Sequence, residues 1–524
     1  MMNEPQPGPA AIENAEIMPS PAAPRTRWQK FLRWKFWRWQ YTGLLFIVIF
    51  TLVFHFIAVG RPSTIVWDEK WYVGDARSIL IGNGDVRPEH PPLAKLFIVA
   101  GEFIFNGFKV PLKNTGQTLQ LAILTDQTNV IYVQDASIFK TGKTLLLDRE
   151  QLNILTVDTQ NNNLVVERDS GGTGIANHLK DTPVYIFTDN PFGWRFFSIV
   201  FGTLGIIIFF LVCRKFGLSL LVSLIATFLL ALENMTFLHS SLALLDVFMV
   251  TFMLAALLTY LNEDYLLCGL FIALSAHCKL VGVLVVIVFF LHFIVYRRKK
   301  WLPFLGSLLL SGVVYVLLIM ILDFFITGSL ENPFTRIQAM LTGTAANTFT
   351  DPKLSISSYP WYWIFPQFIQ VYYNSPNVPF IIYSYDPQYV SFISFLIQIL
   401  ILPAIGFMVY KTVKGSQSAG LIVLWFIALY LLWIPLTLAT NRVTFVFYFL
   451  PVTPVICIGI AMAIGDLLGW LKSKRERLGR TTAGAKTWYA AIGFFLLVHL
   501  ATFIIFNPAI PTIIKTWLPP FNAH

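Results

Sequence analysis

Long apolar runs recur along almost the entire chain, and they constrain its fold more than any other feature of the sequence. A helix that crosses a bilayer needs about 20 apolar residues, and we read about 11 such runs, of which residues 218–232 and 264–277 are short. The others are residues 42–59, 195–213, 241–260, 279–297, 303–326, 392–411, 419–438, 443–467 and 488–507. This pattern predicts an all-α polytopic membrane protein with about 11 transmembrane helices.

The composition argues against the soluble classes of protein. Hydrophobic residues make up 56% of the chain and charged residues only 13%, whereas soluble domains carry roughly 25% charged residues. Lys and Arg together number 38, against 28 for Asp and Glu. In so apolar a chain we interpret this surplus as a topology signal at helix ends, and we expect no nucleic-acid partner.

The basic residues between the apolar runs predict which side of the membrane each loop faces. With the N-terminus in the cytoplasm, the most basic connections all become inner loops, as the positive-inside rule requires. These connections are residues 214–215, 297–300, 411–414 and 472–486. The outer side then receives two long segments, residues 60–194 and 327–391.

The first long outer segment, residues 60–194, contains a stretch whose sequence pattern differs from the rest of the chain. Within residues 108–190, short runs such as NVIYVQ, LNILTVD and PVYIFT alternate with turns rich in Asn, Gly and Asp, which is typical of antiparallel strands. We predict a small all-β module inserted in the first outer loop, with a hairpin turn at the Asn residues 161–163. From about 143 to 187 it resembles a β repeat of phage and bacterial surface proteins, which implies a structural or adhesive part and makes His178 a turn or packing residue.

The expected organisation therefore has five parts. They are residues 1–40, a disordered tail ending in the interfacial stretch RTRWQKFLRWKFWRW; 41–107, the first transmembrane helix and a polar outer loop; 108–190, the β module; 191–510, the transmembrane core; and 511–524, a C-terminal tail. The basic and aromatic stretch suits the headgroup region of a bilayer.

Ionisable residues cluster just after the first apolar run. Asp68 and Glu69 are adjacent, and the motif HPPLAK from His90 to Lys95 follows them. Charged groups at membrane segments are costly and therefore point to function. One carboxylate could accept a proton while the other holds a substrate, but a solvated pair of acids before a proline turn fits the same residues, so both interpretations stay open.

The order of motifs resembles the protein O-mannosyltransferase family, which is glycosyltransferase family 39 with the GT-C fold. It is similar more broadly to polyprenyl-phosphate-dependent glycosyltransferases, including the lipid A aminoarabinose transferases. Asp68-Glu69 followed by HPPLAK looks like the family's pattern after its first span. Four later stretches are similar to family motifs in the same order: FGWRFF at 192–197, SLALLD at 241–246, CKLVG at 278–282 and NRVTFVFYFLP at 441–451.

Two departures from the family pattern bear on location and acceptor. Residues 327–391 are too few for the soluble domain that eukaryotic members carry in that loop, and the β module lies in the first outer loop instead. This favours a bacterial type: a multi-pass protein of the plasma (inner) membrane with its active site on the outer face. It leaves open whether the acceptor is a protein or a lipid.

The resemblance implies roles for the polar residues. Asp68 would be the base that deprotonates the acceptor hydroxyl in an inverting transfer, with Glu69 helping to bind acceptor or sugar, and His90 would bind substrate. A departing lipid phosphate needs nearby positive charge. The candidates are Lys95, Arg195, Lys279 and Arg442, with Asp246 as a partner for one of them.

These implications lead to one expected function and several alternatives. The expected enzyme moves a sugar, mannose first, from a polyprenyl-phosphate donor to a protein hydroxyl. The donor counts as a substrate, no cofactor is expected, and no metal-ligand spacing occurs. The alternatives are the same chemistry on a lipid or cell-wall glycan, a secondary transporter, and an adhesin-like protein. Against a transporter, the chain shows neither internal repeats nor paired broken helices.

Overall fold

The computed structural model describes residues 41–297, 300–345, 348–349, 357–365, 370–373, 389–479 and 481–510. The predicted interfacial stretch and the C-terminal tail lie outside the described residues. The described helices and strands belong to one compact unit that begins at Leu44, apart from the first residues of the helix that starts at Thr42.

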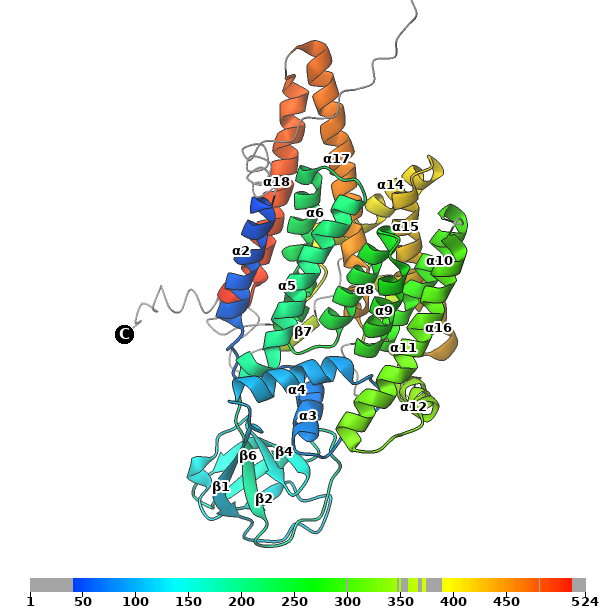
Figure 1. Cartoon of the computed structure of the whole chain (residues 1–524). Coiled ribbons are helices and arrows are strands. Elements are labelled where there is room, and N and C mark those ends of the chain that lie inside the picture. The colour runs from blue at the N-terminus through cyan, green and yellow to red at the C-terminus, as the bar shows by residue number, and fades with distance from the viewer. Residues whose placement is uncertain are drawn as a thin grey trace, which may run out of the picture. The chain divides into compact units, whose positions relative to one another are not determined.

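Helices dominate this unit and most of them lie alongside one another (Figure 1). The longer ones are α2 (Thr42–Ala58), α5 (Pro191–Lys215), α6 (Leu220–Ala231), α8 (Asp246–Leu261), α9 (Tyr265–Cys278), α10 (Val285–Tyr296), α11 (Trp301–Thr327), α14 (Ile401–Val413), α15 (Gln417–Phe426), α17 (Thr453–Leu478) and α18 (Ala483–Phe506). Shorter helices are α7 (Asn234–Ser241), α12 (Pro333–Ala345), α13 (Phe395–Ile399) and α16 (Trp433–Thr440), with the brief turns η2 (Leu280–Leu284), η5 (Ile427–Leu431) and η6 (Val446–Phe449).

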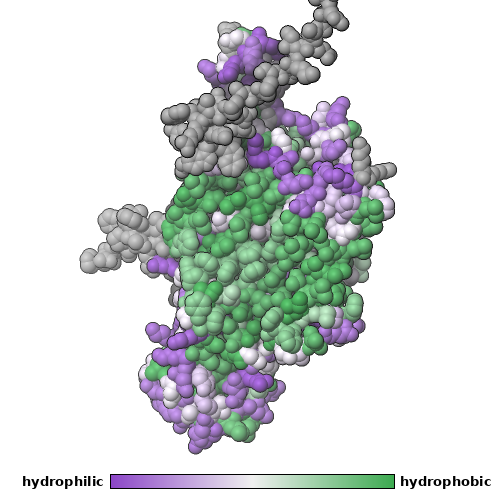
Figure 2. All heavy atoms as spheres, viewed as in Figure 1, coloured by the Kyte–Doolittle hydropathy of each residue, from purple (hydrophilic) through white to green (hydrophobic). Residues whose placement is uncertain are grey.

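The described helices show a multi-pass membrane protein. Five are long and apolar enough to span a bilayer: α5, α11, α17, α18 and the continuous stretch Gln417–Thr440; the pair α6 and α7, bent by 62°, makes a possible sixth. Five shorter apolar helices occupy the remaining predicted ranges, so the count of 11 stays a prediction. Figure 2 shows a broad hydrophobic surface with hydrophilic residues gathered at both of its ends, as a bilayer-spanning surface requires.

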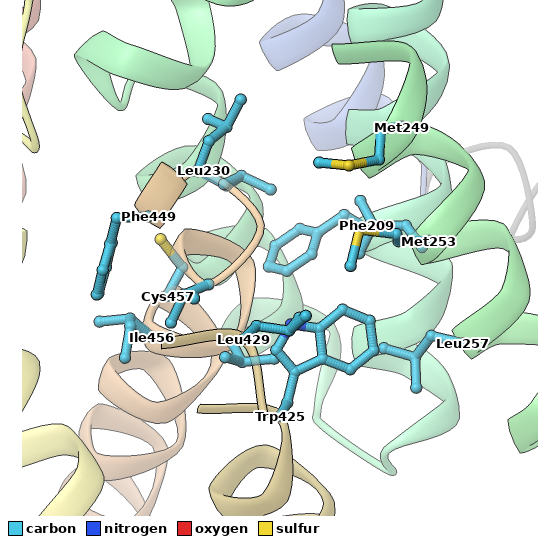
Figure 3. Packing of buried hydrophobic residues seen from close by; sticks show 14 of the residues in the cluster. Phe209, Leu230, Met249, Met253, Leu257, Trp425, Leu429, Phe449, Ile456 and Cys457 are labelled. Atoms are coloured by element: carbon cyan, nitrogen blue, oxygen red, sulfur yellow. The ribbon is translucent and has the colours of Figure 1, made fainter. Parts of the chain in front are cut away.

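The bundle core is built where several helices converge (Figure 3). Met249, Met253 and Leu257 recur every four residues along α8 and therefore line one face of that helix. They meet Phe209 of α5 and Trp425 of α15 in one buried cluster. All four cysteines are buried and unpaired.

Two helices of the first outer loop lie at one end of the bundle. They are α3 (Glu69–Leu80) and α4 (Leu93–Phe105), and α4 runs across the ends of the spanning helices (Figure 1). With 13 residues, α4 is too short to cross a bilayer by itself.

The small antiparallel sheet predicted in this loop is present. Its strands are β1 (Leu112–Thr118), β2 (Val130–Tyr132), β3 (Thr144–Leu147), β4 (Glu150–Asp158), β5 (Asn163–Glu167) and β6 (Pro183–Phe187), in the order β1-β6-β3-β4-β5-β2. The hairpin between β4 and β5 turns at Asn162, whose φ of 50° is a conformation that Asn tolerates. Alternate residues such as Leu152 and Ile154 build the module's own core.

His178 holds the module together rather than lying in a free turn. Its ring nitrogens lie 2.7 Å from Asp148 Oδ2 and 2.9 Å from Glu150 Oε2, and Arg168 donates two hydrogen bonds to Glu150. Burial alone would raise the pKa of Glu150, but the hydrogen bonds from His178, Arg168 and backbone N–H groups lower it to about 2. A buried ion cluster of this kind fixes the loop that returns to β6.

The module is fastened to α3 by buried polar contacts. Gln151 Nε2 donates to Gly74 O at 3.0 Å and to Ser78 Oγ at 2.8 Å. A Cβ atom added to Gly74 would lie 3.0 Å from Gly171 Cα, so the two backbones touch and α3 needs glycine at this crossing. The β4 face that carries Gln151 therefore faces α3.

Candidate active site

Asp68 stands at the N-cap of α3 and makes no capping hydrogen bond. The preceding residue, Trp67, has φ of 43°, a strained value for a bulky side chain that local packing must hold in place. The Trp67 ring packs edge-on against Phe445 and Phe447, with centroids 6.4 and 5.5 Å away. Among the described residues the Asp68 carboxylate has no ion-pair partner, and it makes no capping hydrogen bond to α3.

The surroundings of Asp68 suit a general base. Burial raises its pKa to about 6, an effect that the nearby Lys279 ammonium reduces and the Asp246 carboxylate reinforces. A carboxyl with a pKa of about 6 is ionised near neutral pH and still takes up a proton readily.

Lys279 and Asp246 form a pair beside this carboxylate. Lys279 follows α9 in an extended conformation, and its Nζ lies 2.8 and 3.0 Å from the two oxygens of Asp246, the first residue of α8. The ammonium also lies 5.0 Å from the centre of the Phe447 ring and 5.2 Å from that of Tyr448. The expected pairing of Asp246 with a cation is what the contacts show.

His90 and Tyr72 approach the same region from the first outer loop. Their ring centres lie 5.8 Å apart. Burial lowers the pKa of His90 well below its ordinary value, and the positive charges of Lys279, Lys95, Arg87 and Arg442 lower it further. The imidazole is therefore neutral and can both donate and accept a hydrogen bond.

Arg442 supplies a second cation. It follows Asn441, which ends α16 in the left-handed conformation with φ of 51°. The guanidinium lies 5.9 Å from the Trp433 ring centre. Within the parts of the chain that the structure describes, it has no carboxylate partner.

Glu69 and Arg195 are buried behind Asp68 and bind each other. Arg195 Nε and NH2 lie 2.8 and 2.7 Å from the two Glu69 oxygens, and Glu69 also accepts from the backbone N–H groups of Val66 and Ala243. The remaining Arg195 hydrogen bonds reach the carbonyls of Val59, Pro62 and Thr64. An arginine has five N–H donors, and all five are occupied within the protein.

Lys95 is likewise engaged with the protein. Its Nζ lies 2.9 Å from Asp75 Oδ2, 2.7 Å from Asp85 Oδ1 and 2.6 Å from the carbonyl of Arg87. Asp85 in turn binds Arg336 of α12 at 2.7 Å. These contacts extend into a chain of alternating charges that continues to Arg87 at one end and to Asp323 of α11 at the other.

The eight predicted residues thus divide into two groups at one end of the bundle. Asp68, His90, Arg442 and the Lys279–Asp246 pair gather around one region, whereas Glu69, Arg195 and Lys95 are buried in other ion pairs. The sequence reasoning missed Tyr72, whose pKa is raised first by burial and then by the Asp68 charge. Its position four residues after Asp68, on the same helix face, was an available signal.

No cluster of three His, Cys, Asp or Glu side chains that could hold a metal occurs among the described residues.

Comparisons with known proteins show which family and which solved structures the chain resembles. The family model described as dolichyl-phosphate-mannose-protein mannosyltransferase matches residues 171–330, which include Arg195, Asp246 and Lys279. The solved structure of the S. cerevisiae protein O-mannosyltransferase Pmt1-Pmt2 complex bound to the sugar donor is similar over 90% of both chains, with a TM-score of 0.61 and 12% identity. This likeness shows a shared fold.

A second solved structure, ArnT from Cupriavidus metallidurans bound to undecaprenyl phosphate, aligns with 90% of this chain and 76% of its own, with a TM-score of 0.46 and 12% identity. No curated protein matches the chain by sequence. The family match confirms the predicted resemblance over residues 171–330, which hold three of the five motif stretches.

Proposed function

We propose that this chain, which matches the mannosyltransferase family model over residues 171–330 and shares the fold of the S. cerevisiae Pmt1-Pmt2 structure, is a glycosyltransferase that transfers mannose from a polyprenyl-phosphate donor to a hydroxyl of a protein acceptor. The observation that carries the proposal is the Asp68 carboxylate, unpaired among the described residues and with a pKa raised to about 6, near the Lys279 ammonium. We place the reaction on the outer face of the plasma membrane, with the N-terminus in the cytoplasm.

In the proposed step Asp68 accepts the proton of the acceptor hydroxyl while the hydroxyl oxygen attacks the anomeric carbon of the sugar. The bond from that carbon to the phosphate oxygen breaks, and the lipid phosphate departs as an anion. Attack on the side opposite the leaving group inverts the configuration of the sugar. The phosphate leaves as a stable anion and needs no acid, but its charge needs stabilisation.

Arg442 and Lys279 fit the task of holding the phosphate. A guanidinium binds phosphate oxygens through two parallel hydrogen bonds, whereas an ammonium acts as a compact point charge. Asp246 takes two of the three donors of Lys279, which orients the ammonium and leaves one donor for the substrate. Neutral His90 is available for a sugar hydroxyl.

Glu69, Arg195 and Lys95 suit positioning roles better than substrate contact. Every donor of Arg195 has a partner inside the protein. The Lys95 ammonium makes two hydrogen bonds and an ion pair with Asp75. Glu69 ties the start of α3 to α5 and to the segment before α8, and so fixes the backbone on which Asp68 sits. The proposed step calls for no cofactor.

Transfer from polyprenyl-phosphate-mannose to a serine-containing peptide, measured with purified protein in detergent, tests the proposal. We expect Asp68→Asn to lower kcat by at least about 100-fold, the usual contribution of a general base. The exposed β-module residue Asp126 offers a matched control, since Asp126→Asn removes the same charge far from the site.

An Asp68→Asn protein that keeps the full rate would show that another group is the base. Transfer to lipid acceptors alone would replace the protein acceptor with the lipid alternative. No transfer from any prenyl-phosphate sugar would remove the proposed reaction altogether.

A further inference from the structure

A cleft of about 360 Å³, lined by both polar and apolar residues, lies between α3 and the β module. One wall belongs to the helix end that carries Asp68, with Trp67 and Lys70 on either side of that carboxylate in the chain. The other wall belongs to the sheet. Asp68 does not itself line the cleft, but the backbone that carries it lies between Trp67 and Lys70, which do.

Three polar side chains form a straight row across the sheet wall. Thr144 on β3 pairs directly with Asn153 on β4, and Asn153 pairs directly with Glu167 on β5. Residues directly opposite each other in an antiparallel sheet project from the same face. All three line the cleft, so the register of the sheet delivers a hydroxyl, an amide and a carboxylate side by side.

The same face also fixes the wall in place. Gln151 lies two residues before Asn153 and so shares its face; it is buried and bonded to α3 at Gly74 and Ser78. Arg87 reaches the carbonyl of Gly171 from the outer loop at 3.1 Å. These contacts hold the sheet against α3 on one side of the cleft, so both walls of the cleft are fixed in place.

The charges of the cleft indicate what it would hold. Glu167 projects from the sheet and Lys70 from α3, and neither has an ion-pair partner among the described residues. A neutral sugar chain would leave both charges unmatched. A polypeptide segment with charged side chains beside its serine or threonine can pair with either, while its amide groups meet Asn153 and Thr144.

We infer that the β module forms the acceptor-binding wall of the enzyme: the cleft lined by Thr144, Asn153, Glu167, Lys70 and Trp67 binds a polypeptide acceptor with a basic residue near its serine or threonine. This inference rests on the proposed function and adds the recognition of the acceptor. The hydroxyl to be glycosylated lies past Trp67, next to Asp68.

The test compares three serine peptides that carry Lys, Ala or Glu beside the serine. We expect wild-type protein to show the lowest KM for the Lys peptide. Glu167→Lys raises that KM by about threefold or more and lowers the KM for the Glu peptide, as expected for a partly exposed ion pair. The KM for the donor and the kcat at saturating peptide stay unchanged, because Glu167 touches neither the donor nor the reacting atoms.

Asp126→Lys is the matched control, since it makes the same change of charge at an exposed position of the same module outside the cleft. Equal shifts for Glu167→Lys and Asp126→Lys, or no shift for either, overturn the cleft assignment while transfer itself persists. A wild-type protein that transfers sugar to no peptide overturns the protein acceptor and the cleft together. A preference of the wild-type protein for the Lys peptide that disappears in Glu167→Gln supports the assignment.

Discussion

At the scale of single residues, Asp68 is placed where two effects on its charge oppose each other. The N-terminus of a helix favours a negative charge by 0.3–1 kcal/mol, which corresponds to less than one unit of pKa. Burial acts in the opposite direction and raises the pKa from 3.8 to about 6. Burial therefore prevails, and the side chain acquires the proton affinity that a base needs.

The rate should accordingly depend on pH through this one group. Asp68 works only when deprotonated, so kcat/KM is expected to fall about tenfold for each pH unit well below 6 and to level off above it. The measurement is kcat/KM for the peptide acceptor between pH 4.5 and 8. A profile whose acid limb centres near pH 4 would contradict the raised pKa, and Asp68→Asn should show no such limb.

The candidate residues could be named from the sequence, but the pairs that they form could not. Motif order and topology placed all eight candidates at the outer end of the helices. The partners lie far apart along the chain: Glu69 and Arg195 are 126 residues apart, and Asp85 and Arg336 are 251 apart. A single sequence does not reveal which cations already have a carboxylate partner, so Arg195 and Lys95 looked as available as Arg442.

At the scale of elements, the Glu69–Arg195 pair joins three segments. Glu69 is the first residue of α3, Arg195 lies in the first turns of α5, and the backbone N–H of Ala243 comes from the segment before α8. Breaking a buried pair by removing one charge typically costs 3–5 kcal/mol, because the other charge stays buried without a partner. The pair therefore fixes where α3 begins.

Glu69→Gln should mainly reduce stability. We expect a loss of about 3 kcal/mol or more, seen as a lower thermal midpoint in detergent, because Arg195 would keep its charge without a counter-ion. Asp68→Asn, which breaks no ion pair among the described residues, should leave the midpoint nearly unchanged. A Glu69→Gln protein with an unchanged midpoint and a raised KM for donor or acceptor would instead support the substrate-binding role that the sequence suggested.

At the scale of the whole molecule, the position of the charges predicts orientation in the membrane. The basic connections and the site lie at opposite ends of the spanning helices, and the sequence predicted this arrangement from loop charges alone. The number of spanning helices is harder to predict from the sequence. Lys279 interrupts one apolar stretch, and bends or short turns divide others. Periodicity does not show whether such a pair of short helices crosses together.

Single introduced cysteines can test the orientation, since all four native cysteines are buried. Glu331→Cys lies after α11 and Lys414→Cys lies after α14, both at exposed positions. We expect a membrane-impermeant maleimide to label Glu331→Cys on intact cells and Lys414→Cys only after permeabilisation. The reverse labelling pattern would show that the protein has the opposite orientation and that the site faces the cytoplasm.

The pairing of the first and last strands of the module has a consequence for how the module could have evolved. Its first and last strands are neighbours, paired from Leu112 with Phe187 to Thr118 with Pro183, so the module enters and leaves the transmembrane core at a single spot. Directly beside that spot, α4 and α5 cross so closely that a Cβ atom on Gly101 would lie 2.2 Å from Gly193 O. An insert with adjoining ends leaves such a crossing undisturbed. The module could thus be gained, lost or exchanged as one genetic cassette, allowing acceptor preference to evolve apart from the catalytic core.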